Sequence, residues 1–199
     1  KSFDSIIFAG SLCSYFRKNR KDFLKQSYLI DDRNITIKIK DDPIFKNKDL
    51  KIGLSWKSVV SVYGKLKSLN LSDFKPLIKK NRQFINLQYG DVDEELKQKV
   101  NQEFDIYSFK KIDLFNDLEY LMSILKNLDV FVTVSNSTAH LASAMGVKTF
   151  LICPKKSSTY FYWSNENNKT PWYQNVEIFR IETSIEKTLD QVNEALDKL

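Results

Sequence analysis

The sequence contains little glycine and little proline, 5 and 4 residues among 199. This scarcity excludes collagen-like repeats and low-complexity linkers, whose composition depends on those two residues. Only two cysteines occur, Cys13 and Cys153, and they are far apart and without C-x-x-C spacing. A disulfide framework and a cysteine-based zinc site are therefore not expected, and we expect a reducing, cytoplasmic location.

Long apolar runs are also missing. No stretch approaches the roughly 18–20 uninterrupted apolar residues that a membrane-spanning helix needs, so we expect no membrane span. The short apolar run near the start lacks the basic–apolar–small order of a secretion signal, and no initiator Met precedes it. We therefore expect that further sequence lies before Lys1.

The charge is mildly positive, with 31 Lys and Arg against 25 Asp and Glu and a net charge of +6. Basic and acidic residues alternate as on solvated helix faces, and no run of five or six like charges occurs. No nucleic-acid-binding signature is present. Nucleic acid is therefore not expected as a partner, whereas an anionic small ligand such as a nucleotide suits this surface.

Strand-like apolar runs alternate with helical patterns along most of the chain. The expected strands are 51–56, 83–88, 104–107, 129–134, 148–153 and 176–180, with a short strand or extended entry at 5–9 and an irregular stretch to 49. The expected helices are 72–80, 93–102, 117–127, 137–145 and 183–199. This alternation predicts an α/β fold, a Rossmann-like three-layer sandwich with a mainly parallel sheet. We assign residues 1–48 to a lead-in segment and 49–199 to the domain.

Capping signals support these helices. Asn116 or Asp117 is expected to cap the helix that follows, and Gly146 is expected to end the 137–145 helix in a left-handed conformation. Pro76 is unfavourable inside the 72–80 helix.

The segment 134–146, VSNSTAHLASAMG, carries the clearest chemical signal. A strand runs into four small polar residues and then into a helix that bears the only histidine, His140. Hydroxyl groups and free N–H groups at a helix N-terminus, with about +0.5 charge from the helix dipole, favour an anion. The alternative is simple capping by Ser135 or Ser137, with His140 a satisfied, half-buried side chain.

A second cluster, residues 56–68, follows the first main strand. Lys57, Lys65 and Lys67 could each bring an ammonium group to a diphosphate, and Lys67 is the preferred one. The alternative is that these are ordinary exposed lysines. Neither G-x-G-x-x-G nor G-x-x-x-x-G-K-[ST] is present, so dinucleotide-fingerprint and P-loop sites are excluded.

Several segments in this order resemble a known family. They are IGLSW at 52–56, the Lys67–Ser68 pair, FINLQYGD at 84–91, residues 112–118, VTVSNSTAHLASAMG at 132–146 and PWYQNVEIFR at 171–180. The chain resembles the C-terminal half of a bacterial GT-B glycosyltransferase. The most similar type is the heptosyltransferase-like (glycosyltransferase family 9) domain that is found after tetratricopeptide repeats.

The resemblance implies a nucleotide-sugar donor site for a UDP-, ADP- or GDP-linked sugar, used without a metal or cofactor. The implied site residues are Asn136, Ser137 and Thr138 at the diphosphate, His140 beside it, Lys67 as the basic partner, Gly90 and Asp91 near the ribose, and Phe115 and Asn116 near the base. Lys57 and Ser135 are added to this donor site from the strand-end loops. Ser135 stands where heptosyltransferases carry an Asp that contacts the sugar, which argues against a heptose donor. The acceptor and its binding site would belong to the missing N-terminal half or a tetratricopeptide region.

Glycosyl transfer leaves negative charge on the departing nucleoside diphosphate, which helix-end N–H groups, Lys67 and His140 would stabilise. No convincing catalytic base is found in residues 50–199, so we expect the isolated chain to bind donor weakly and to lack transferase activity. Two alternatives remain open. One is a degenerate, non-catalytic module for protein interaction. The other is a nucleic-acid binder that stacks bases on the aromatic stretch formed by residues 160–163, 172 and 173, although such a stretch is more often core packing.

Overall fold

A computed structural model describes residues 3–24, 26–58, 64–98, 104–154, 161–163 and 168–199. Its centre is a six-stranded sheet in which every pair of neighbouring strands is parallel. The strands are β1 (Leu50–Ser55), β2 (Arg82–Asn86), β3 (Ile106–Tyr107), β4 (Val130–Val134), β5 (Thr149–Cys153) and β6 (Val176–Arg180). Their order is β3-β2-β1-β4-β5-β6. The α/β class and the parallel sheet predicted from the sequence are confirmed.

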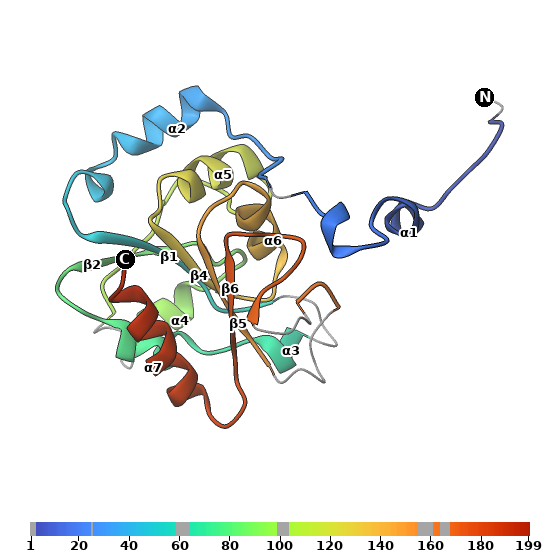
Figure 1. Cartoon of the computed structure of the whole chain (residues 1–199). Coiled ribbons are helices and arrows are strands. Elements are labelled where there is room, and N and C mark those ends of the chain that lie inside the picture. Colours follow the sequence, from blue (N-terminus) through green and yellow to red (C-terminus); the bar gives the residue numbers. More distant parts are fainter. Residues whose placement is uncertain (1–2, 25, 59–63, 99–103, 155–160, 164–167) are drawn as a thin grey trace.

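Helices flank this sheet on both faces (Figure 1). The α-helices are α1 (Leu12–Phe16), α2 (Arg33–Lys40), α3 (Gly64–Lys67), α4 (Asp93–Lys97), α5 (Leu118–Lys126), α6 (Ser137–Ala144) and α7 (Ile185–Leu196). The 3-10 helices are η1 (Ala9–Ser11), η2 (Arg20–Asp22), η3 (Pro43–Phe45), η4 (Leu71–Leu77) and η7 (Phe161–Trp163). Among the described helices, none is long and apolar enough to span a bilayer.

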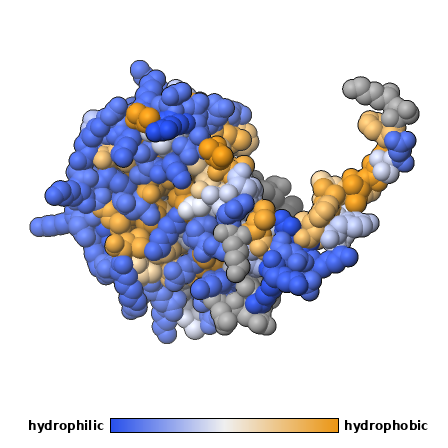
Figure 2. Space-filling view, turned by 45° about the horizontal axis from the view of Figure 1, so that its top comes forward, coloured by the Kyte–Doolittle hydropathy of each residue, from blue (hydrophilic) through white to orange (hydrophobic). Residues whose placement is uncertain are grey.

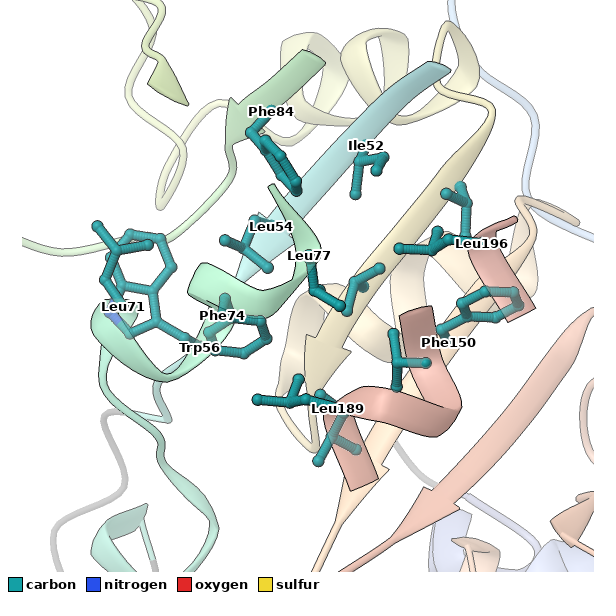
Figure 3. Close-up of a cluster of buried hydrophobic side chains, with 14 of the residues drawn as sticks. Ile52, Leu54, Trp56, Leu71, Phe74, Leu77, Phe84, Phe150, Leu189 and Leu196 are labelled. Atoms are coloured by element: carbon teal, nitrogen blue, oxygen red, sulfur yellow. The ribbon is translucent and has the colours of Figure 1, made fainter. Parts of the chain in front are cut away.

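One face of the sheet is covered by η4 and α7. Their buried side chains, including Phe74 and Leu189, pack on Ile52, Leu54 and Phe150 from the central strands (Figure 3). Alternate residues of each strand point to this face because side chains in a strand alternate with a period of two.

The opposite face is covered by α2, α5 and α6. Ile39 of α2, Leu121 of α5 and Ala142 of α6 pack there with Phe131 of β4. Strands buried on both faces explain why their sequences are almost uninterrupted apolar runs. The three layers agree with the predicted sandwich.

Four local predictions are corrected. The stretch expected to be irregular up to residue 49 contains α2, whose Asp32 side chain caps it by accepting from the N–H groups of residues 34 and 35. Residues 5–9 do not form a strand, and their end belongs to η1. The helix expected at 72–80 is the 3-10 helix η4, because Pro76 removes an N–H donor and clashes with an α-helical backbone.

The fourth correction concerns α4. This helix ends at Lys97, where Gln98 takes an extended ψ of 135°. The remainder of the predicted 93–102 helix from residue 99 onward lies outside the described residues.

Residues 3–24 and 26–32 form an N-terminal arm that extends away from the sheet before it joins α2 (Figure 1). The arm carries η1, α1 and η2, and it presents apolar side chains to solvent, including Ile6 and Phe8 (Figure 2). Its final part is attached to the domain. The N–H groups of Tyr28 and Leu29 both donate to the carbonyl of Ala144, at 2.9 and 3.2 Å, and Phe23 packs edge-on against Trp172.

Candidate anion-binding site at the strand switch

The strand order reverses between β1 and β4. The chain proceeds from β1 to β2 and β3 on one side of the sheet and from β4 to β5 and β6 on the other. Ser55 pairs with Thr133, so the carboxyl ends of β1 and β4 lie side by side. Ligands of open α/β sheets bind at this kind of position. The described residues that follow β1 and those that follow β4, parts of the two segments that the sequence singled out, therefore meet at this edge, as predicted; residues 59–63 lie outside the described residues.

Asn136 joins these two loops. Its Nδ2 donates to the hydroxyl of Ser55 at 2.9 Å and to the carbonyl of Lys57 at 3.3 Å. Its Oδ1 accepts from the N–H of Ala139 at 2.9 Å and caps α6. The alternative in which Ser135 or Ser137 caps this helix is therefore wrong. A buried amide can satisfy a donor and an acceptor at once, which a serine hydroxyl in this place does less completely.

Gln88 organises the end of β1, and the sequence analysis missed it. Its Oε1 accepts from the Ser55 hydroxyl at 3.0 Å and from the N–H groups of Trp56 and Lys57 at 2.9 and 2.7 Å. Its Nε2 donates to the carbonyl of Tyr89 at 2.9 Å. A polar residue at the end of an apolar strand run is the only sequence signal that could have indicated it. Together with Asn136, it fixes the backbone on both sides of the switch.

Helix geometry leaves the first N–H groups of α6 outside the intrahelical ladder. The N–H of Ala139 is used by Asn136, whereas those of Ser137 and Thr138 open the helix ahead of it. The Ser137 side chain is exposed and the Thr138 side chain is buried. This helix end has the donors and the dipole that hold an anionic group.

Lys67, at the end of α3, is half-buried. Burial lowers its pKa from the ordinary value. Its charge acts on His140 of α6, whose pKa it depresses, and on the thiol of Cys153. Lys67 thus acts electrostatically on the histidine-bearing helix, and its role as the basic partner of the anion site stays a prediction.

Lys57 is held differently. Its Nζ lies 2.5 Å from the carboxylate of Glu95, which also accepts from the indole N–H of Trp56 at 3.0 Å. Burial raises the pKa of Glu95, but the hydrogen bonds from Lys57, Trp56 and Leu71 outweigh burial and leave the pKa below its ordinary value. The Lys57 ammonium is thus paired with a carboxylate of the chain itself, and its backbone, not its side chain, contributes to the switch.

His140 lies in a group of aromatic rings. Its imidazole stacks on Trp163 with ring centroids 4.5 Å apart and an interplanar angle of 23°. Tyr162 meets it edge-on at 4.6 Å, and the hydroxyl of Tyr173 lies 3.0 Å from Nδ1. Burial, with a smaller contribution from Lys67, lowers the pKa of His140 from about 6.5 to about 4. The ring is therefore neutral at pH 7.

Trp163 also contacts the start of the turn. Its indole N–H donates to the hydroxyl of Ser135 at 3.0 Å, and both side chains are buried. Ser135 therefore serves as an acceptor for the aromatic group and still has a hydroxyl proton to donate. No local pattern predicts this contact, because residues 135 and 163 are distant along the chain.

The aromatic stretch is divided between the interior and the surface. Trp163 and Tyr173 pack around His140, as in the core-packing alternative, whereas Phe161 is exposed. Tyr160 lies outside the described residues.

An apolar hollow of about 170 Å³ lies beside the start of α6. Its lining residues are Tyr89, Leu114, Phe115, Leu118, Leu121, Ser137, Thr138 and Leu141. The rings of Tyr89 and Phe115 are 6.0 Å apart and tilted by 46°. The structure thus brings Phe115 together with Ser137 and Thr138 in one hollow; that a base and a diphosphate bind there stays a prediction.

A larger and more polar hollow of about 700 Å³ continues from it at the ends of β2 and β3. Tyr89 and Phe115 line both hollows, and Gly90 and Asn116 line only the second. Gly90 has a φ of +87°, a conformation that glycine adopts without strain. Asp91 accepts from the N–H of Asp93 and does not line either hollow. Asp91 is thus the predicted ribose contact that is least well placed.

Among the described residues, no three His, Cys, Asp or Glu side chains converge in a way that could hold a metal ion.

Comparisons with known proteins place the chain among its relatives in sequence and in fold. No family model matches the sequence. Protein FlbA of Caulobacter vibrioides is 31% identical over an alignment of 138 residues that covers 65% of this chain and 22% of FlbA. The chain therefore spans about a fifth of the length of this relative.

Among solved structures, E. coli ADP-heptose lipopolysaccharide heptosyltransferase II matches with a TM-score of 0.59 and 11% identity, covering 89% of this chain and 56% of that one. A glycosyl transferase family 9 protein from Veillonella parvula gives 0.53 and 12%, covering 86% and 46%. WaaG, a glycosyltransferase of lipopolysaccharide biosynthesis, gives 0.51 and 11%, covering 94% and 51%. The chain thus has a heptosyltransferase-like glycosyltransferase fold and spans about half the length of these proteins.

Proposed function

We propose that this chain binds a nucleotide-sugar donor and forms the donor half of a glycosyltransferase. The observation that carries the proposal is the start of α6 at the strand switch, where Ser137 and Thr138 line an apolar hollow and where the charge of Lys67 acts on His140 of the same helix. The N–H groups and the lysine suit a diphosphate, and the apolar hollow suits a nucleobase.

The orientation of the ligand follows from this arrangement. The diphosphate lies at the N-terminus of α6, where the helix dipole, Lys67 and the neutral imidazole of His140 stabilise its charge. The base enters the apolar hollow beside Phe115, and the ribose lies toward Gly90. When the sugar leaves, the same groups stabilise the charge that develops on the nucleoside diphosphate, because they are already in place before the reaction.

The acceptor site and the base that activates the acceptor belong, in this proposal, to sequence outside these residues. The structural relatives are about twice as long as the matched part, which supports this division. The association with tetratricopeptide repeats stays a prediction from the sequence.

The proposal is tested by titrating the isotope-labelled chain with UDP, ADP and GDP and following its amide signals by NMR. At least one of the three is expected to bind in the millimolar range or tighter. Lys67→Ala is expected to weaken binding roughly tenfold, because a charge-assisted contact is lost. Lys65→Ala is the matched control, since Lys65 lies on the same short helix with an exposed side chain. Absence of binding by all three nucleotides would leave the non-catalytic module as the better explanation.

A further inference from the structure

Two buried side chains that carry hydroxyl groups line the apolar hollow beside α6. Tyr89 is 7% exposed and Thr138 is 3% exposed, and both residues line this hollow. Among the residues that the structure describes, neither hydroxyl group has a hydrogen-bond partner. Buried polar side chains are nearly always hydrogen-bonded in folded proteins, so two unpaired hydroxyls at one small hollow need an explanation.

The positions of both residues are fixed by contacts that do not use the hydroxyls. The carbonyl of Tyr89 accepts from Nε2 of Gln88 at 2.9 Å, and the tyrosine ring packs at a tilt against Phe115. Thr138 is the second residue of α6, directly before the N–H group that Asn136 caps. The rest of the lining consists of leucines and the phenylalanine, apart from one exposed serine. The walls of the hollow therefore offer the two hydroxyls few partners.

The energetic cost of this arrangement points to a ligand. A buried hydroxyl that has left water and gained no partner destabilises the folded chain. A site that is built to hydrogen-bond a ligand carries this cost, because its polar groups pair only with that ligand.

A nucleobase fits this hollow better than an entirely apolar ligand or a phosphate alone. Its flat faces suit the ring of Phe115 and the surrounding leucines, whereas its edge carries hydrogen-bond donors and acceptors. A hydroxyl both donates and accepts, so Tyr89 and Thr138 can each pair with either kind of group on that edge.

We propose that the hydroxyls of Tyr89 and Thr138 hydrogen-bond the edge of the nucleobase and are contacts that recognise the base of the donor. This inference rests on the proposed function and adds to it. The resemblance places Thr138 at the diphosphate. Its N–H group keeps that role, and its hydroxyl is assigned to the base. Tyr89 is a residue that the sequence did not indicate.

The stability of the ligand-free chain tests whether the two hydroxyls lack partners. Tyr89→Phe and Thr138→Val keep the shape of each side chain and remove only the hydroxyl, so the urea midpoint is expected to stay unchanged or to rise. Tyr107→Phe is the matched control for the tyrosine, since its hydroxyl donates to the carboxylate of Asp42 at 2.8 Å. Thr188→Val is the matched control for the threonine, because Thr188 is also 3% exposed but its hydroxyl is bonded to two backbone carbonyls, at 3.2 and 3.0 Å. Both controls are expected to lower the midpoint.

Nucleotide affinity tests the contact with the base. UDP, ADP and GDP are titrated by NMR into the unmodified chain, and the one that binds best is then titrated into the variants. Tyr89→Phe and Thr138→Val are each expected to weaken its binding about fivefold. Inorganic pyrophosphate has no base and is expected to bind both variants as well as it binds the unmodified chain. The two control variants are expected to leave both affinities unchanged.

Three results would overturn the proposal. A midpoint that falls in Tyr89→Phe and Thr138→Val as far as in their controls, or failure of these variants to fold, would show that the hydroxyls already have partners. Unchanged nucleotide affinity would remove their role in binding while leaving the proposed function intact. An equal loss for nucleotide and pyrophosphate would assign the hydroxyls to the diphosphate. If no nucleotide binds the unmodified chain, the proposed function itself fails and the contact with the base fails with it.

Discussion

The side-chain amide of Asn136 donates to the hydroxyl of Ser55 at 2.9 Å across the switch between β4 and β1. Both residues are buried, so the bond is shielded from water and its loss would leave polar groups without partners. Through this bond the loop after β1 and the start of α6 are held as one unit. The proposed anion site depends on that unit, because its donors and its lysine come from the two different loops.

Asn136→Ala should therefore destabilise the fold. It removes a helix cap and two buried hydrogen bonds, and we expect a loss of roughly 2–3 kcal/mol in the free energy of unfolding. Urea denaturation followed by circular dichroism measures this loss. Ser137→Ala is the control, with an expected change within about 0.5 kcal/mol because its side chain is exposed. Equal losses in the two variants would show that Asn136 is not the cap that matters.

Gly53→Ala tests the packing of β1 against the α5 side of the sheet. A Cβ at this position would lie 2.9 Å from the Leu87 Cδ1 atom and closer still to Leu128 Cδ1. We expect a loss of about 1–3 kcal/mol from overpacking. Gly10→Ala on the arm meets nothing within 4 Å and should leave the urea midpoint unchanged. A stable Gly53→Ala protein would mean that the neighbouring leucines yield easily.

His140 should make the fold less stable as the pH falls. Its pKa in the folded state is about 4, below the ordinary value of 6.5, so protons bind the unfolded chain first. Stability from this group is complete above pH 6.5 and is lost as the pH falls from 6.5 toward 4, with a slope of at most about 1.4 kcal/mol per pH unit. His140→Gln should flatten this part of the stability profile. An imidazole pKa near 6.5, read by NMR in the folded chain, would contradict the burial of this ring.

Phe115→Ala distinguishes the contribution of the nucleobase to binding from that of the diphosphate. Stacking of a base on an aromatic ring contributes about 1–3 kcal/mol, so we expect nucleoside diphosphate affinity to fall roughly tenfold. Inorganic pyrophosphate has no base and should bind the variant and the unmodified chain equally well. Calorimetric or NMR titrations with both ligands make the comparison. An equal decrease for both ligands would show that the apolar hollow does not hold the base.

The sequence predicted the regular part of the fold because that part depends on local patterns. Buried parallel strands appear as apolar runs, and the left-handed Gly146, with φ +81°, ends α6 as expected. Asp117, one of two candidates, caps α5. The prediction is wrong at Pro76, because the apolar pattern indicates an α-helix over 72–80 whereas the segment that contains this proline is the 3-10 helix η4.

The site was predicted less completely, because its decisive contacts join residues distant in the sequence. The pair of Trp163 with Ser135 and the bonds from Gln88 to the loop after β1 have no local signature. Lys57 is another residue whose contact is not local. The prediction that it lies at the end of a strand is confirmed, but its pairing with Glu95 depends on where α4 packs.

The central claim is that the amide groups opening α6 receive a diphosphate, and the most direct measurement is the response of those amides themselves. An ¹H–¹⁵N titration of the chain with ADP and with pyrophosphate should shift the signals of Ser137 and Thr138 most strongly and saturably, and Lys67→Ala should weaken both titrations. If these two signals stay unmoved at millimolar ligand while others shift, the ligand binds elsewhere and the account is wrong.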